Sequence, residues 1–257
     1  MIIPAKYQRG LRVCWILLMV IGLTGCLEWL RAYRTYLQLN EFDRHFAIQA
    51  DQDFTLLFKH PILMSEDFVN LSKLQPSQNI PLDFGKRWRY DFKKVNDQGD
   101  VIKPELNFFF DLKFNRFQKL TAWTFSPLFL QIAPAEFLEA SLRSIAGAKI
   151  NEEKKQLRTD PDLIQKIKAK LPLKENVVAQ LGEPLEITRE MGFEIYRYHF
   201  MLQTTDIEKG YEDRALNAVK LTFDTQTQEL VKMSGRFAGL KISINYRKYL
   251  DIDDKLS

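Results

Sequence analysis

Apolar residues occupy every second position in four segments of the chain, which is the pattern of a strand that buries one face. Trp88–Phe92 and Tyr196–Phe200 share the order aromatic, Arg, Tyr, polar, Phe. Phe110–Phe114 and Val219–Phe223 alternate in the same way. The pattern predicts antiparallel strands whose aromatic residues are buried, while Arg89 and Arg197 lie on the opposite face.

These segments recur in the same order 108 to 109 positions apart. A third pair, Phe125–Ile132 and Phe237–Ile244, matches at an offset of 112 and is also predicted to be extended. A proline stands twelve residues before the first segment in both copies, at Pro76 and Pro184. Shared order, spacing and residue types favour an internal duplication.

Three- and four-residue apolar spacings predict a helix over about 28–42, with an apolar stripe at Leu27, Leu30, Tyr33 and Leu37. Two interpretations remain open for this helix. In the first it lies at a membrane surface with Arg31 and Arg34 near lipid headgroups. In the second it packs on the sheet that follows.

Further helices are expected between the strands. One begins near Ser65 and ends before Pro76, and another follows Pro134. The charged run 151–159 is typical of a solvated helix or linker, and Asp160-Pro161 restarts a helix through Ile167. A last helix over 175–181 ends at Gly182. Two apolar segments around residues 51–53 predict a β-hairpin with a three-residue loop.

The start of the chain has the composition of a secretory signal peptide. Lys6, Arg9 and Arg12 precede an apolar run over 13–23 that contains no acidic residue. A membrane-spanning helix needs about 20 apolar residues, and fifteen residues separate Arg12 from Glu28. Cleavage therefore fits the run better than a permanent anchor, which remains the alternative.

The run ends in Leu23, Thr24, Gly25 and Cys26, which resembles the lipobox of bacterial lipoproteins. The resemblance implies that Cys26 carries a diacylglyceryl group and becomes the first residue of the mature protein. Leu27 follows where lipoproteins retained in the inner membrane often carry Asp, so the resemblance favours the outer membrane, with the protein facing the periplasm.

Composition changes this interpretation little. The formal charge of +4 includes three positive residues of the leader, so the basic character gives no argument for nucleic-acid binding. Cys14 leaves with the leader and Cys26 would be acylated, so no disulfide is expected. Nineteen Phe and nine Tyr supply a core.

No motif for catalysis, metal binding or a cofactor is visible in the sequence. His45, His60 and His199 lie far apart and none has a second ligand at metal-binding spacing. Asp91 and Asp111 are expected on the same face of neighbouring strands. A glycosidase-like carboxylate pair is one interpretation, and surface ion pairs with Arg89 are the other.

Part of the second half resembles the SmpA/OmlA domain, the fold of a small lipoprotein in the outer-membrane β-barrel assembly machinery. The resemblance is carried by Val177–Pro184, Tyr196, Tyr198, Leu221–Asp224 and Glu229–Val231. Tandem copies of similar folds occur in secreted β-lactamase inhibitor proteins. The resemblance to the SmpA/OmlA domain implies a helix followed by an antiparallel meander and a role in binding another envelope protein.

We therefore predict an α+β protein of two related halves, each with helices packed on a meander. The expected parts are a leader over 1–25, a first half over 26–133, a helical connector over 134–172 and a second half over 173–257.

The favoured function is non-catalytic binding of an envelope protein, and the alternatives are a periplasmic inhibitor or ligand-binding module and an enzyme with scattered catalytic residues. The candidate partner surface comprises Phe109, Phe129, Arg89 and Arg197. No cofactor, metal or nucleic-acid partner is expected.

Overall fold

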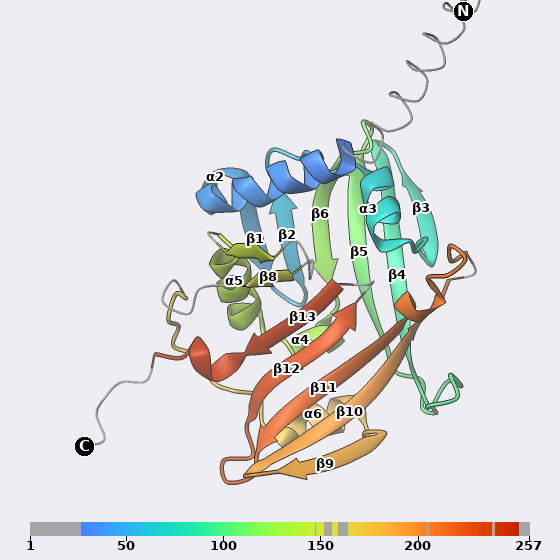
Figure 1. The fold of residues 1–257 in the computed structure, drawn as a ribbon. Coiled ribbons are helices and arrows are strands. Elements are labelled where there is room, and N and C mark those ends of the chain that lie inside the picture. Colours follow the sequence, from blue (N-terminus) through green and yellow to red (C-terminus); the bar gives the residue numbers. More distant parts are fainter. Residues whose placement is uncertain are drawn as a thin grey trace, which may run out of the picture.

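The computed structural model describes residues 27–146, 148–151, 156–158, 164–204, 206–237 and 240–251. Within these residues, eleven strands form one antiparallel sheet in the order β1-β2-β6-β5-β4-β10-β11-β12-β13, with β3 and β9 added at β4 and β10. Figure 1 shows this sheet curled into a half-barrel. Strands β7 and β8 form a separate two-stranded sheet.

The strands have the following bounds: β1 Phe46–Ala50, β2 Phe54–Phe58, β3 Gln78–Leu82, β4 Gly85–Val95, β5 Asn107–Asn115, β6 Leu120–Phe125, β7 Lys149–Asn151, β8 Gln156–Arg158, β9 Glu186–Glu190, β10 Phe193–Leu202, β11 Leu216–Asp224, β12 Leu230–Phe237 and β13 Leu240–Asn245. The helices, with short 3₁₀ turns marked η, are residues 27–38, η1 Leu39–Glu41, α2 Phe42–His45, α3 Ser65–Ser72, α4 Pro127–Leu130, α5 Ala135–Ser144, α6 Lys174–Leu181, η3 Glu212–Arg214 and η4 Tyr246–Lys248. We call residues 27–38 the leading helix.

Alternation along the strands gives the sheet two different faces. In β4, Trp88, Tyr90 and Phe92 are buried, whereas Arg89 and Asp91 on the other face are only partly covered. The same holds in β10, where the buried set is Tyr196, Tyr198 and Phe200 and Arg197 lies opposite. We call the aromatic side the inner face and the other the outer face. The predicted burial of these six aromatic residues is confirmed.

Helices cover the inner face. The ring of Phe68 in α3 lies 5.8 Å from that of Tyr90 in β4. Phe129 in α4 packs on Phe110 of β5 with ring centroids 5.2 Å apart, and Phe137 in α5 packs on Tyr246. The core is therefore aromatic and continuous across the sheet.

The sheet is continuous because β4 pairs with β10. Phe108 of β5 and Phe200 of β10 pack across this junction with ring centroids 4.9 Å apart. Lys94, next to it on the inner face, is buried and donates from Nζ to the carbonyls of Leu181 and Glu183 at 2.7 and 2.6 Å. Burial lowers the pKa of the Lys94 ammonium. These contacts join residues before 126 to residues after 173.

Several predicted elements are confirmed. The leading helix, the hairpin of β1 and β2, α3 and α6 all lie where the apolar spacing places them. Gly182 ends α6 and donates its N–H to Val178 O at 2.7 Å. Its φ of 65° is a positive value that glycine adopts without strain.

The third pair of matching segments was wrongly predicted for the first copy. Strand β6 ends at Phe125, and Pro127–Leu130 forms α4 instead of a strand. Pro127 has no N–H for a ladder and suits the first turn of a helix, so the apolar alternation that follows it was misleading. In the second copy β13 is extended as predicted.

The connector also differs from its prediction. Residues 149–151 and 156–158 pair as the β7–β8 hairpin, so the charged run is not helical there. The predicted helix start at Asp160-Pro161 lies outside the described residues. Residues 164–172, over which this helix was expected to continue until Pro172 breaks it, are not helical, and Ile167 forms a parallel bridge with Leu250.

Elements in the two parts of the chain correspond at nearly constant offsets. β3 and β9 are 108 positions apart, and α3 and α6 are 109 apart. Both meanders carry a register shift at matching positions, Lys113/Phe114 and Thr222/Phe223. The hydroxyl groups of Tyr90 and Tyr198 both donate to a carbonyl just after the preceding helix, that of Leu74 at 3.3 Å and that of Gly182 at 3.1 Å.

Candidate functional site

The predicted lipidation residues Leu23, Thr24, Gly25 and Cys26 lie outside the described residues. The leading helix is described from residue 27, so the first described element directly follows the predicted attachment point. Figure 1 shows this helix drawn across β1 and β2. The side of this helix that faces away from the body would therefore form part of the surface next to the proposed anchor.

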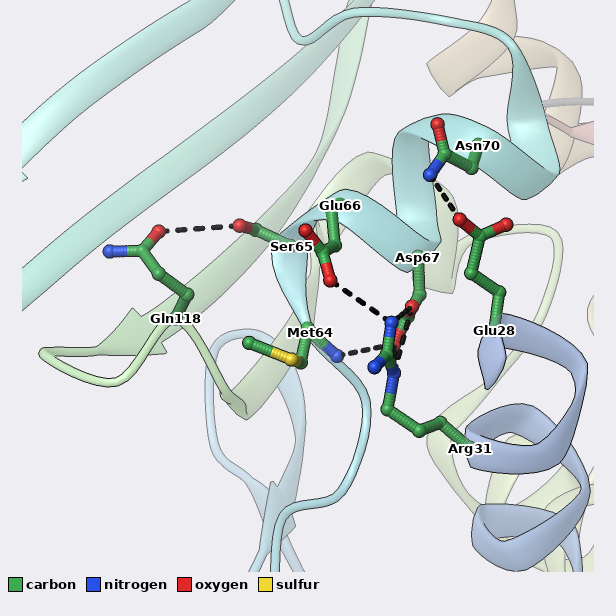
Figure 2. A network of polar contacts seen from close by, with 8 residues as sticks. All are labelled: Glu28, Arg31, Met64, Ser65, Glu66, Asp67, Asn70 and Gln118. Carbon is green, nitrogen blue, oxygen red and sulfur yellow. Dashed lines mark hydrogen bonds and ion pairs between the residues drawn. The ribbon is translucent and has the colours of Figure 1, made fainter. Parts of the chain in front are cut away.

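Polar residues hold the leading helix to α3 (Figure 2). Arg31 donates from Nε to both oxygens of Asp67, at 3.0 and 2.8 Å, and from Nη2 to Glu66 at 3.0 Å. The hydrogen bond with Asp67 raises the pKa of Arg31. Asp67 is fully buried and also accepts the backbone N–H of Met64 at 2.8 Å. The carboxylate thus caps the start of α3 and binds the leading helix at once.

Additional polar contacts extend along the same side of the leading helix. Asn70 donates to Glu28 at 2.5 Å, near the start of the helix (Figure 2). Farther along, the Tyr36 hydroxyl donates to the carbonyl of Ala148 at 2.6 Å, and the side-chain amide of Gln38 donates to the backbone carbonyl of His60 at 2.9 Å. The helix is attached to the body over its whole length by hydrogen-bonding groups.

The apolar side of the leading helix is exposed. Leu30, Tyr33 and Leu37 are 42%, 48% and 43% exposed, and Leu27 and Trp29 at the start are exposed as well. In α5, by contrast, Phe137, Leu138 and Ala140 are buried. Exposed apolar groups in such a row mark an interaction surface more often than isolated ones do.

The predicted partner residues lie on opposite faces of the sheet. On the outer face, the Arg89 guanidinium lies 3.9 Å from the ring centroid of Phe109 and donates to both oxygens of Asp111 at 2.8 and 2.7 Å. Phe109 is half-buried. Phe129 is 1% exposed within the inner core, so its assignment to a partner surface was wrong. The cause is the α4 helix, which turns this residue inward.

Arg197 belongs to a second outer-face group. It donates to Asp97 at 3.0 Å and to Glu186 at 2.8 Å, and its Nη1 lies 2.9 Å from His199 Nε2. Burial, followed by the charge of Arg197, lowers the pKa of His199. The group lies over β9, β10 and the turn after β4, apart from Arg89 on β4, so the two arginines occupy separate ion-pair groups.

The carboxylates Asp91 and Asp111 do share the outer face, as predicted. Arg89 and Asp111 form an ion pair with two hydrogen bonds. Burial raises the pKa of Asp91, which accepts a hydrogen bond from Gln78 at 2.9 Å. The arrangement matches the surface ion-pair interpretation. Within the described residues, no three His, Cys, Asp or Glu side chains are placed to hold a metal ion.

A groove of about 850 Å³ opens beside the α4–α5 loop and the start of α6. Its lining combines apolar side chains with charged ones of both signs. Its lining includes Leu130, Glu136, Ile167, Lys168, Lys170, Val177, Leu250 and Asp251. The groove is a feature that the sequence did not indicate, because its walls come from four separated segments.

No known protein family, curated protein or solved structure matches this chain. In the part of the chain that the structure describes, no helix has the length and apolarity to cross a membrane.

Sequence reasoning missed Asp67 and the outward orientation of the leading helix. Glu28, Arg31 and Gln38 recur at helical spacing on the side opposite the apolar stripe. This polar row could have indicated that the polar side of the helix faces the body, because it is as regular as the apolar row. Which side meets the body depends on a buried acceptor 36 residues away.

Proposed function

We propose that this chain is a non-catalytic bacterial envelope lipoprotein, attached through Cys26 to the periplasmic side of the outer membrane, that binds another envelope protein. The observation that carries the proposal is the leading helix, which directly follows the predicted lipidated residue and turns its apolar side away from the body. An apolar face beside a lipid anchor fits a protein that works at a surface.

We further propose that the chain contains an internal duplication, with the SmpA/OmlA-like arrangement in its second half. The order helix, hairpin, helix and meander occurs first from the leading helix to β6 and again from α5 to β12. In this proposal α5 and the β7–β8 hairpin belong to the second copy. The matching offsets and register shifts support the duplication. The fold alone does not determine the function, which depends on the residues at the protein surface.

Metabolic labelling with palmitate tests the attachment. Wild-type chain should incorporate label and Cys26→Ala should incorporate none, because only the Cys26 thiol ends the lipobox-like motif. Cys14→Ala is the matched control and should label like wild type. Equal labelling of wild type and Cys26→Ala, or no labelling of wild type, contradicts the proposal.

Photo-crosslinking tests the binding of an envelope protein. A photoreactive residue in place of Phe109 or Arg197 on the outer face should yield the same discrete crosslinked species from intact cells. A photoreactive residue at Glu136, in the groove, serves as a comparison. Crosslinks from neither outer-face position would remove the support for a partner on this face.

The groove supports a second candidate, a ligand-binding module. Its apolar lining residues and its cations at Lys168 and Lys170 suit an amphiphile with an acidic group. Native mass spectrometry of protein extracted from membranes should then show a bound small molecule. Val177→Trp would fill the groove and should abolish that mass shift, whereas a retained shift places the ligand elsewhere.

A further inference from the structure

We infer that the exposed side of the leading helix and two neighbouring turns form a surface that lies on an anionic lipid bilayer. The inference rests on the proposed attachment at Cys26 and adds the orientation of the body on the membrane. It assigns the bilayer to the apolar row Leu27, Leu30, Tyr33 and Leu37 and to the turn residues Phe84 and Phe117.

The polar contacts of the leading helix determine which side meets the bilayer. Arg31 is held by the buried Asp67 and does not reach headgroups. A helix that used its apolar side against the sheet would leave Asp67 buried without a cation. The observed arrangement instead places the hydrogen-bonding side on the body and leaves the apolar side for a medium that favours it.

Two exposed phenylalanines lie on neighbouring turns. Phe84, in the β3–β4 turn, is 81% exposed, and Phe117, in the β5–β6 turn, is 60% exposed. The turns are adjacent because Gly85 pairs with Asn115. A Cβ on Gly85 would lie 1.9 Å from the carbonyl oxygen of Phe114, and its φ is 145°, so glycine is what lets the first turn approach the second.

Hydrogen bonds tie these turns to the start of the leading helix. Ser65 at the start of α3 donates its backbone N–H to Gln118 O at 2.9 Å, and α3 binds Glu28 through Asn70. Figure 2 shows α3 between Gln118 on one side and the leading helix on the other. The exposed aromatic residues and the predicted anchor therefore belong to one end of the molecule.

Charge favours an anionic bilayer over a neutral one. Arg34 on the helix and Lys113, Arg116 and Lys119 on or beside the β5–β6 turn are exposed. The acidic residues of the leading helix, the start of α3 and the β3–β4 turn are Glu28, Glu66, Asp67 and Asp83. Glu66 and Asp67 pair with Arg31, and Glu28 accepts a hydrogen bond from Asn70. Basic residues next to apolar ones suit phosphate headgroups above acyl chains.

Spin labels on the anchored full chain test the inference. Single cysteines replace Tyr33 or Phe117, with Lys220→Cys on the exposed outer face as the matched control. The protein is placed in vesicles of phosphatidylethanolamine and phosphatidylglycerol. Labels at 33 and 117 should collide several-fold more with oxygen, which concentrates in lipid, than with a water-soluble nickel complex. The label at 220 should show the reverse.

Two outcomes overturn the inference. One is equal accessibility of the labels at 33 and 220 to the nickel complex in vesicles. The other is protection at 33 with spin–spin broadening in both neutral and anionic vesicles, which indicates a second copy on the helix. Charge reversal by Arg116→Glu and Lys119→Glu should raise the nickel accessibility of the label at 33 several-fold in anionic vesicles only.

Failure of lipidation can be separated from failure of the inference. With Cys14 and Cys26 both replaced by Ser, the uncleaved leader holds residue 27 at the membrane without an acyl group. Protection at 33 in this chain supports the bilayer surface even where palmitate labelling fails, whereas exposure at 33 in both chains rejects it.

Discussion

At the scale of single residues, the attachment of the leading helix depends on one buried carboxylate. Asp67 receives Arg31 and the Met64 N–H, so both its oxygens are satisfied only while the helix is docked. Removing the cation leaves a buried charge with a single backbone donor, which is costly because little solvent can replace the lost partner.

Arg31→Ala should therefore lower the free energy of unfolding by about 3 kcal/mol, the lower end expected for breaking a buried pair. Arg34→Ala, an exposed arginine on the same helix, is the control and should change it by less than about 0.5 kcal/mol. Urea unfolding measures both. Equal effects of the two variants would contradict the assigned role of Asp67.

His199 makes stability depend on acid pH. Its pKa is lowered in the folded protein, first by burial and then by Arg197, so the unfolded chain takes up the proton first as pH falls through about 6.5. The contribution of His199 is absent at pH 8 and becomes increasingly unfavourable until pH reaches the folded pKa.

Replacing His199 by Gln removes this penalty while keeping an acceptor for Arg197. The variant should lose less stability than wild type between pH 8 and pH 5, as measured by urea unfolding at both pH values. His45 and His60 remain in both proteins and cancel in the comparison. A wild type that is no more acid-sensitive than the variant would show that the folded pKa of His199 is not lowered.

Residue patterns predicted the buried and outward sides of the strands but not every contact. Trp88, Tyr90 and Arg89 followed from period two alone, because a strand alternates wherever it lies. Phe129 did not, since a proline two residues earlier changed the local conformation. The pairing of Arg31 with Asp67 was also unpredictable, because it depends on where two elements 36 residues apart come to rest.

At the scale of elements, each meander is joined to the helix before it by a tyrosine hydroxyl. Tyr90 donates to Leu74 O and Tyr198 to Gly182 O. Both rings are buried, so each hydroxyl would be left without water if its acceptor moved. The proposed duplication implies that the two hydrogen bonds contribute similarly to the free energy of unfolding.

Tyr90→Phe and Tyr198→Phe should each lower the unfolding free energy by about 1 kcal/mol, the usual net value of one buried hydrogen bond. Tyr33→Phe, whose ring is exposed, should have almost no effect. Thermal or urea unfolding of the three single variants gives the comparison. Clearly unequal values at positions 90 and 198 would argue that the two contacts are not equivalent.

Element prediction worked where local signals were complete. The α6 helix has a stop at Gly182 with Pro184 beyond, and the first hairpin has a short polar loop between apolar strands. It failed in the connector, where the charged run was predicted to be solvated helix or linker, whereas residues 149–151 and 156–158 pair as the β7–β8 hairpin. Pairing of such short strands depends on their surroundings more than on composition.

At the scale of the whole molecule, the two parts of the chain share one sheet and one core. The predicted boundary around 134–172 is crossed by the β4–β10 pairing, by the contact of Phe108 with Phe200 and by Lys94 on the end of α6. Separate halves would have to expose these groups. The sequence could not indicate this, because alternation predicts strands but not which strands become neighbours.

The shared core predicts that the molecule unfolds as one unit. The tryptophans that follow the predicted leader, Trp29, Trp88 and Trp123, all precede residue 126. Their fluorescence therefore reports on the first part, while far-UV circular dichroism reports on both. The two urea transitions should coincide, as expected when no intermediate is populated. Phe200→Ala, in the second part, should lower the unfolding free energy by about 3–5 kcal/mol and shift both signals equally.

Because Phe200 is fully buried against Phe108 across the junction, a dichroism change without a matching fluorescence shift would mean that the first part folds independently. Ile187→Ala, exposed on β9, is the control and should leave both transitions in place.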